Sequence, residues 1–287
     1  MSAPVSLRLR SRLPDLQPAL RRIAEILLAD SAGAAAMTIG QLARAAECSE
    51  ATVVRFAHEV GFDGYRDLRF HLHEEAVALQ QRAVQDGYAG DIDPQDDLGT
   101  VVGKIAAADS RAAQDTARGL DLSALAATAE AILTARRIVL LGVGASGLAA
   151  VDLQQKLSRI GLLATSHLEA HEALCTTALL EAEDVLVCIS HTGRTDEVVA
   201  AMRLAAKGPA TTVAVTAATA SPLAVAADHV LLTAAIESTF RSGATASRIA
   251  QLTVVDCIFV AVAQQLPDLG RDALRRTREA VESRRLR

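Results

Sequence analysis

Aromatic side chains are scarce in this chain of 287 residues, which contains two Tyr, five Phe and no Trp. Proteins that read single-stranded nucleic acids stack the unpaired bases on aromatic side chains. The composition therefore argues against a protein that reads RNA or single-stranded DNA.

Paired cysteines and long apolar runs are also missing. The four cysteines lie far apart and form no Cys-x-x-Cys pair; they are Cys48, Cys175, Cys188 and Cys257. We therefore expect buried thiols in a reducing, cytoplasmic environment. Neither a metal nor a cofactor is expected. The apolar runs at residues 138–143 and 185–189 are too short to span a membrane, so no membrane partner is expected. No apolar stretch follows the charged first residues, and the sequence shows no signal peptide.

Basic charge is not in excess either, since the formal net charge is −5. Residues 1–82 contain ten Arg and ten Asp or Glu, so the rest of the chain carries the whole negative charge. A neutral first part neither proves nor excludes DNA binding, because a basic face would have to be local. The chain is 51% hydrophobic and can bury one large core or two modest ones.

The first part of the chain has the pattern of short, capped helices. Residues 16–30 have apolar positions at helical spacing and predict one amphipathic helix that ends before residues 31–33. A second helix begins after Thr38, with Gln41 completing a capping box. A third begins after Ser49 and ends at Gly61, where a left-handed residue is favoured. Two short helices around a tight turn predict a helix-turn-helix.

The start of the third helix presents polar side chains where such motifs enter the DNA major groove. Arg55 could read guanine, hold a phosphate or be a solvated surface residue, and Ser49 and Thr52 could contact phosphate as readily as base. Glu50 could simply complement the helix dipole, and Tyr65 could contact the DNA backbone or be a half-buried core residue. The candidate DNA-binding residues are Gln41, Ser49, Glu50, Thr52, Arg55 and Tyr65.

Residues 38–68 resemble the DNA-binding domain of the RpiR-type transcriptional regulators, mainly through residues 49–56 and 61–65. The resemblance implies binding of double-stranded operator DNA as a homodimer or homotetramer. One departure is Cys48, where the family usually has Val, and a small buried thiol should pack in the same way. The alternative is that this region is a helical interaction module that makes no contact with DNA.

The remainder alternates strand and helix patterns. Residues 83–94 read as a linker with Gly, Asp and Pro, and residues 97–118 and 122–135 read as helices. Strands predicted at 138–141, 162–165, 185–189, 212–216 and 230–233 alternate with helices, which indicates one parallel sheet flanked by helices. The predicted fold is an all-α helix-turn-helix head at 1–82 joined to an α/β domain at 95–287.

One strand of this sheet leads into an anion-binding pattern. The apolar run 185–189 ends in Ser190, His191, Thr192, Gly193 and Thr195, and a helix predicted at 197–206 follows. Hydroxyls and the free amides of a helix N-terminus can together bind one phosphate. The alternative is an ordinary polar turn between a strand and its helix.

Residues 190–197 resemble the phosphosugar-binding loop of the sugar isomerase (SIS) domain family, Ser-x-Ser/Thr-Gly-x-Thr-x-Asp/Glu. By this resemblance Ser146, in the Gly-rich turn 142–147, also contacts the ligand. Residues 247–251 resemble the Ser-Arg-x-Ala-Gln stretch of the regulators, where Arg248 could reach an acidic ligand group or pair with a carboxylate. The candidate ligand-binding residues are Gly144, Ser146, Ser190, His191, Thr192, Gly193, Thr195 and Glu237.

Two functions follow from these patterns, and the favoured one is a non-enzymatic transcriptional regulator that senses a phosphorylated sugar or sugar-acid phosphate. The alternative is a phosphosugar isomerase with an added helical head. It needs a catalytic base, and although suitable residue types exist, none lies in a recognisable catalytic pattern; they are His167, Glu169, His171, Glu172, His191 and Glu237. A nucleotide enzyme using residues 142–147 is less favoured, because Glu169 follows no clear strand end. The Arg-rich tail 271–287 is either a solvated end or a partner contact.

Overall fold

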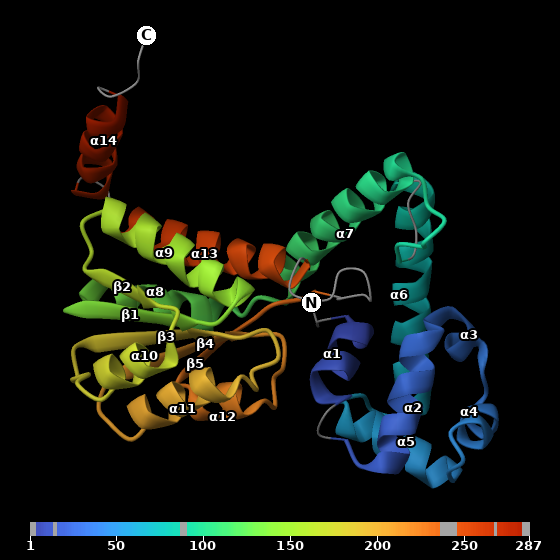
Figure 1. The fold of residues 1–287 in the computed structure, drawn as a ribbon. Coiled ribbons are helices and arrows are strands. Elements are labelled where there is room, and N and C mark those ends of the chain that lie inside the picture. Colours follow the sequence, from blue (N-terminus) through green and yellow to red (C-terminus); the bar gives the residue numbers. More distant parts are fainter. Residues whose placement is uncertain (1–3, 14–15, 87–90, 236–245, 267–268, 283–287) are drawn as a thin grey trace. The chain divides into compact units, whose positions relative to one another are not determined.

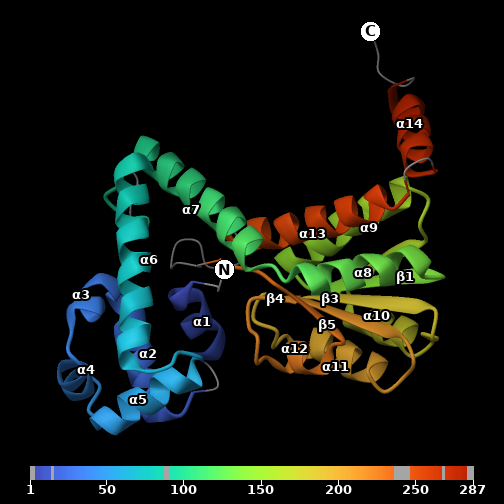
Figure 2. The same ribbon diagram turned by 180° about the vertical axis from the view of Figure 1, so that it is seen from behind.

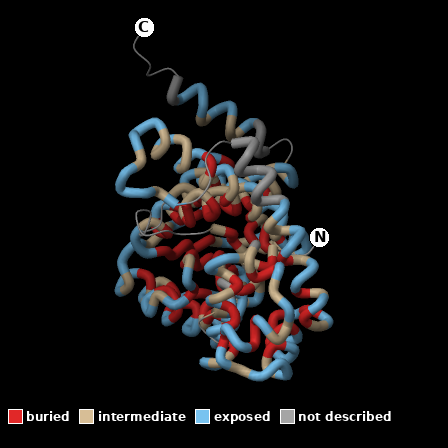
Figure 3. The backbone as a smooth tube through the Cα atoms, turned by 90° about the vertical axis from the view of Figure 1, so that its right-hand side faces the viewer, coloured by how far each residue is buried: buried red, intermediate tan, exposed pale blue. Residues whose placement is uncertain are grey.

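The structure of the protein is a computed structural model that describes residues 4–13, 16–86, 91–235, 246–266 and 269–282. The chain divides into two compact units, Met1–Arg111 and Ala112–Arg287 (Figure 1). Each unit has buried residues of its own, which are drawn in red in Figure 3. Glu237 lies outside the described residues.

The described residues of the first unit form helices. They are α1 (Val5–Arg12), α2 (Pro18–Ala29), α3 (Ser31–Ala36), α4 (Ile39–Ala45), α5 (Glu50–Glu59) and α6 (Tyr65–Asp86), and α7 (Leu98–Gly119) crosses the boundary between the units. Helices α1, α3 and α5 contact α6 (Figure 1). The core contains side chains with almost no exposed surface, namely Leu9, Ile23, Leu27, Leu42, Val53, Phe56, Leu68 and Leu72.

The predicted helix-turn-helix is confirmed in α4 and α5. The Thr38 hydroxyl accepts from the Gln41 amide, and the Gln41 side chain accepts from the Thr38 amide, which is the predicted capping box. Ser49 caps α5 by accepting from the Thr52 amide. Gly61 follows α5 with a φ of +84°, in the left-handed region that glycine adopts at low cost.

Two short helices of the first unit were not predicted. The apolar residues of helix α1 show no clear helical spacing, because three Arg interrupt them. The sequence predicts that a helix ends before residues 31–33, and α2 does end at Ala29. The Asp30 side chain, however, accepts from the Gly33 amide and caps a further helix, α3. Helix α6 continues through Asp86, so the first residues of the predicted linker are helical.

The second unit contains the predicted parallel sheet. Its strands are β1 (Arg137–Gly142), β2 (Ala164–His167), β3 (Asp184–Ile189), β4 (Thr211–Thr216) and β5 (His229–Leu232), and its helices are α8 (Leu122–Thr134), α9 (Ala145–Arg159), α10 (Ala170–Thr177), α11 (Asp196–Ala205), α12 (Pro222–Ala226), α13 (Ala246–Gln264) and α14 (Leu269–Glu282). The strand order is β2-β1-β3-β4-β5, and every pairing is parallel.

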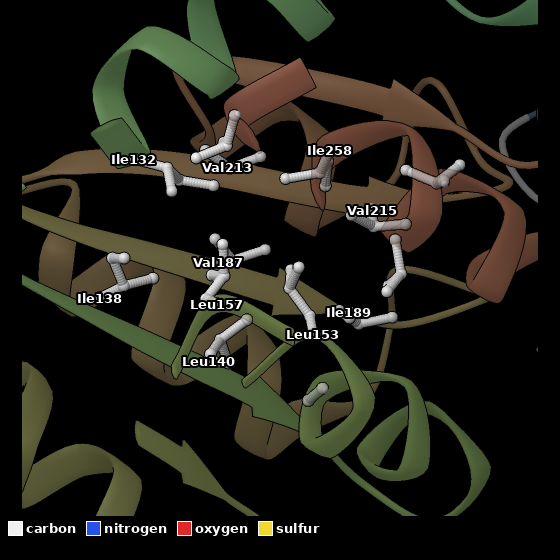
Figure 4. Packing of buried hydrophobic residues seen from close by; sticks show 14 of the residues in the cluster. Ile132, Ile138, Leu140, Leu153, Leu157, Val187, Ile189, Val213, Val215 and Ile258 are labelled. Atoms are coloured by element: carbon white, nitrogen blue, oxygen red, sulfur yellow. The ribbon is translucent and has the colours of Figure 1, made fainter. Parts of the chain in front are cut away.

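Helices cover both faces of this sheet. Helices α8, α9 and α13 lie on one face, and α10, α11 and α12 lie on the other (Figures 1 and 2). On the first face, Leu153 and Leu157 of α9 and Ile258 of α13 pack against strand residues such as Val187 and Val213 (Figure 4). Strands covered on both faces are largely apolar, and all six residues of β3 are buried.

Strand β2 begins two residues later than its sequence pattern predicts. The chain leaves α9 through Gly161, whose φ is +89°, and the Leu162 amide still bonds to the Leu157 carbonyl. Leu162 therefore completes the end of the helix before the chain enters the sheet.

Helix α13 corrects the expectation that no apolar stretch of the chain is long enough to cross a membrane. Among the described helices it is long enough, at 19 residues, and apolar enough, with a mean hydropathy of 1.6, to cross a membrane. Those criteria are also met by core helices, and α13 packs against α8 and α9 with eight buried residues. Its apolar character is therefore accounted for by the core of this unit.

Candidate functional sites

Three of the candidate DNA-binding residues, Ser49, Glu50 and Thr52, lie at the start of α5. The Ser49 hydroxyl lies 3.1 Å from the Thr52 amide and 2.8 Å from the Thr52 hydroxyl. Glu50 lies in the first turn of the helix and is exposed. Two hydroxyls and one carboxylate are thus grouped at the end of the helix that such motifs direct into the major groove.

Arg55 lies one turn further along α5 and is exposed. Its Nη2 donates a hydrogen bond of 2.7 Å to Oε1 of Gln17, the residue that precedes α2. This contact could not be predicted from the sequence, because Gln17 lies outside the helix-turn-helix pattern. The bond orients the guanidinium while leaving it on the surface.

Gln41 and Tyr65 have structural partners. The exposed Gln41 holds the capping box of α4. Tyr65 is buried, and its hydroxyl donates to the Met37 carbonyl at 2.9 Å. Burial raises the pKa of this phenol. Of the two roles considered for Tyr65, this placement favours the core residue.

The candidate ligand-binding loops follow two neighbouring strands. Gly142 at the end of β1 is in register with Ile189 at the end of β3. Helix α9 then leaves toward one face of the sheet and α11 toward the other (Figure 1). In open parallel sheets of this strand order, ligands bind at the carboxyl edge where the crossovers change sides. The loops with Ser146 and Ser190 both begin there.

Hydrogen bonds bring Ser190, Gly193 and Thr195 together in the loop after β3. The Ser190 hydroxyl lies 3.0 Å from the Thr195 hydroxyl and accepts from the Gly193 amide at 3.2 Å. Thr195 occupies the N-cap position of α11, yet its side chain makes no capping hydrogen bond. The hydroxyl is thereby directed to Ser190, and the N-terminus of α11 is left without a side-chain cap.

The same loop is packed tightly against the segment after β4. Gly193 has a φ of +62°, and a Cβ added there would lie 2.1 Å from the Ser221 hydroxyl. The Gly193 carbonyl accepts from the Leu223 amide, and the His191 carbonyl accepts from the Ala217 amide. These contacts fix the backbone of the loop. The sequence pattern does not reveal that Ser221 supports the loop.

The Gly-rich turn after β1 is also compact. A Cβ at Gly142 would lie 2.6 Å from backbone atoms of Ser146, so the strand end and the first turn of α9 touch directly. Gly144 precedes α9 with a φ of +60°. The largely buried Ser146 hydroxyl accepts from Nε2 of Gln251, on α13, at 2.9 Å. Thr192 is exposed, and its hydroxyl accepts from the Arg194 amide.

Glu169, one of the residues considered as catalytic bases, is placed unfavourably for that role. Glu169 caps α10 by accepting from the amides of His171 and Glu172, and these bonds lower the pKa of its carboxyl. A base with a lowered pKa is a weak proton acceptor. Its position as a helix cap also removes the acidic residue expected of a dinucleotide site. Within the described residues no group of three or more metal-ligating side chains is present.

At the opposite edge of the sheet, where the strands begin, a buried carboxylate and two Arg side chains have a structural role. Asp184 begins β3 and is fully buried, and it accepts hydrogen bonds from Arg136 at 2.9–3.0 Å and from Arg137 at 2.9 Å. Despite its burial, these bonds hold the pKa of this carboxyl at about 2. A hollow of about 350 Å³ lies on this edge between Ala206 and Thr211 and beside His229, away from both candidate loops.

Comparisons with known proteins match both units. Residues 4–78 match the family described as helix-turn-helix domain, rpiR family, and residues 131–261 match the SIS domain family. An HTH-type transcriptional regulator of Caldanaerobacter subterraneus subsp. tengcongensis is 36% identical over 257 residues, covering 90% of this chain and 89% of that protein. The HTH-type transcriptional regulator RpiR of Escherichia coli strain K12 is 32% identical over 243 residues, covering 85% of this chain and 80% of RpiR.

A solved structure is similar over almost the whole chain. The Vibrio vulnificus NanR protein, complexed with ManNAc-6P, superposes with a TM-score of 0.63 at 30% identity, covering 99% of this chain and 100% of NanR. The sugar isomerase domain of an RpiR transcription factor from Sphaerobacter thermophilus has a TM-score of 0.57 at 26% identity and covers 61% of this chain and 97% of that domain.

Proposed function

We propose that this chain, which belongs to the RpiR family of HTH-type transcriptional regulators, binds operator DNA through its first unit and senses a phosphorylated sugar or sugar-acid phosphate through its second. The observation that carries the sensing role is the loop after β3, where the Ser190 and Thr195 hydroxyls meet beside the uncapped start of α11. The complex of the similar NanR protein with ManNAc-6P supports a phosphosugar as the ligand class.

The DNA contacts are proposed at the start of α5. Ser49, Thr52 and Arg55 supply hydroxyls and one guanidinium, which are suited to phosphate oxygens and base edges. Glu50 complements the positive end of the α5 dipole. Gln41 is retained as a contact from α4, whereas Tyr65 is assigned to the core because its hydroxyl is bonded to Met37.

The phosphate contacts are proposed at the switch point of the sheet. Ser190, Thr192 and Thr195 supply hydroxyls, and Gly193 lets the backbone approach the anion without a Cβ in the way. Gly144 and Ser146 supply the opposing loop, and His191 and Glu237 remain proposed contacts to the sugar. No metal or cofactor is invoked for this site.

Binding without turnover is the proposed mode of action. Aldose–ketose isomerisation needs a base whose pKa is matched to the working pH, and Glu169 is committed to capping α10 with a lowered pKa. The relatives named above are transcriptional regulators. The alternative, a phosphosugar isomerase, is tested by following the interconversion of aldose and ketose phosphates by NMR with purified protein.

Regulation requires that the ligand prefer one arrangement of the DNA-binding units, since a ligand with equal affinity for all states shifts none of them. We propose a cytoplasmic homodimer or homotetramer, because paired helix-turn-helix units read paired half-sites. The protein's oligomeric state is measured directly by analytical ultracentrifugation.

The DNA-binding arm of the proposal is tested by fluorescence anisotropy on DNA upstream of the protein's own operon. The Arg55→Ala variant should lose about 1–3 kcal/mol of binding free energy, the scale of one guanidinium contact to a base. Arg203→Ala removes one exposed Arg of α11 in the second unit and is the matched control. Equal DNA affinity in Arg55→Ala and the control would remove Arg55 from the interface.

The sensing arm is tested by calorimetric titration with a panel of phosphorylated sugars that includes ManNAc-6P. Ser190→Ala should weaken the bound sugar phosphate by about 1.5–3 kcal/mol, the scale of a hydrogen bond to a charged group. DNA binding without ligand should be unchanged. Ser158→Ala, at an exposed position near the end of α9, is the control. The loop assignment fails if Ser190→Ala binds the sugar as tightly as this control.

A further inference from the structure

A fully buried amide lies on α13 among apolar residues. Gln251 has no exposed surface, and its Nε2 donates to the Ser146 hydroxyl on α9 at 2.9 Å. Its Oε1 has no hydrogen-bond partner within the described residues. A buried acceptor without a partner lowers stability, and an apolar side chain of similar shape would avoid that cost. Stability therefore does not explain why an amide side chain lies at this buried position.

The direction of the hydrogen bond supplies that reason. An amide nitrogen can only donate, so the Ser146 oxygen uses a lone pair to accept from Gln251. The hydroxyl hydrogen of Ser146 must then point elsewhere. Ser146 lies in the first turn of α9, at the carboxyl edge of the sheet and beside the end of β1. Phosphate oxygens at neutral pH are hydrogen-bond acceptors, and a hydroxyl held as a donor is what they require.

We propose that Gln251 is a positioning residue that holds the Ser146 hydroxyl as a hydrogen-bond donor toward the phosphosugar. The inference rests on the proposed function of the second unit and adds one residue that would not touch the ligand itself. It also accounts for the polar end of the Ser-Arg-x-Ala-Gln stretch, in which Gln251 faces the core of the unit.

Substitutions of Gln251 separate this role from simple packing. Gln251→Met keeps the volume and removes both the donor and the buried acceptor, so the melting temperature should stay equal or rise. The affinity for ManNAc-6P should fall about threefold, because a freed hydroxyl distributes over about three staggered orientations.

The experiment is calorimetric titration of the full-length protein with ManNAc-6P and, separately, with inorganic phosphate. Gln251→Met is measured alone and together with Ser146→Ala. If Gln251 acts through Ser146, the double variant should bind no more weakly than Ser146→Ala. Gln264→Met, at an exposed position at the end of the same helix, is the matched control. Melting temperature and ligand-free DNA binding show that each variant is folded.

The outcomes distinguish the inference from the proposed function. If wild type binds either probe and Gln251→Met binds it equally well, the positioning role is overturned while the phosphosugar site stands. Additive losses in the double variant would likewise overturn it, since Gln251 would then act independently of Ser146. A wild-type protein that binds neither probe at millimolar concentration would overturn the phosphate site and this inference together.

Discussion

Gly193 is the residue of the ligand loop where a single methyl group should have the largest effect. A Cβ at this position would lie 2.1 Å from Oγ and 2.5 Å from Cβ of Ser221, and 2.9 Å from the Thr216 hydroxyl. Ser221 cannot move freely, because it is buried, donates to the Ala218 carbonyl and caps α12 through the Ala224 amide. In Gly193→Ala, either the loop or the cap of α12 must therefore shift.

The expected cost for Gly193→Ala is the sum of three effects. A non-glycine residue at a φ of +62° costs about 1–2 kcal/mol. Loss of the Ser221 cap costs about 1 kcal/mol, and loss of its bond to Ala218 costs about 1 kcal/mol more. We expect a destabilisation of about 3–4 kcal/mol, which for a unit of this size lowers the melting temperature by about 10 °C.

Gly161→Ala is the matched control for this substitution. Gly161 also has a positive φ, at +89°, but no atom lies within 4 Å of an added Cβ. It should therefore cost only the backbone term, about 1–2 kcal/mol. Differential scanning calorimetry of the full-length variants measures both effects. The account of a tightly packed ligand loop is refuted if Gly193→Ala is no less stable than Gly161→Ala, or if it binds sugar phosphate as well as the control.

Two further predictions concern residues away from the ligand loop. Tyr65→Phe should lower the stability of the first unit by about 1 kcal/mol through loss of the bond to the Met37 carbonyl, while its operator affinity in the anisotropy assay stays at the wild-type value; a weakened affinity with unchanged stability would return Tyr65 to the DNA interface. The pKa of Asp184 is depressed from 3.8 to about 2 in the folded state, so its contribution of about 2 kcal/mol is present above pH 4 and is lost as the pH falls toward 2. Calorimetry of wild type and Asp184→Asn at pH 7 and pH 3 should show a stability difference that shrinks at the lower pH, and a constant difference would contradict the depressed pKa.

The sheet could be predicted from the sequence because its strands are buried on both faces. Such strands appear as short apolar runs, and runs ending at Leu141, Ile189 and Thr216 gave three of them within one residue of their observed ends. The helix-turn-helix could also be predicted from the sequence, because the caps at Thr38 and Ser49 are local signals that need no tertiary partner.

Helix α1 could not be predicted for the opposite reason, since its stability comes from distant contacts. It has eight residues, and an isolated helix of that length is unstable in water. Arg8 donates to the carbonyls of Val60 and Gly61 and lies 4.1 Å from the centre of the Phe62 ring. These partners follow α5, more than fifty residues away, and no local pattern records them.

The candidate site shows the same division between local and tertiary signals. Ser49, Thr195 and Ser221 all occupy N-cap positions, and the side chains of Ser49 and Ser221 bond to amides of their own helices as caps normally do. The Thr195 hydroxyl instead lies 3.0 Å from the Ser190 hydroxyl, and α11 begins without a side-chain cap. Thr195 therefore does not cap its own helix, although the loop around it is firmly packed. An anion bound at the start of α11 would supply the missing hydrogen-bond acceptor.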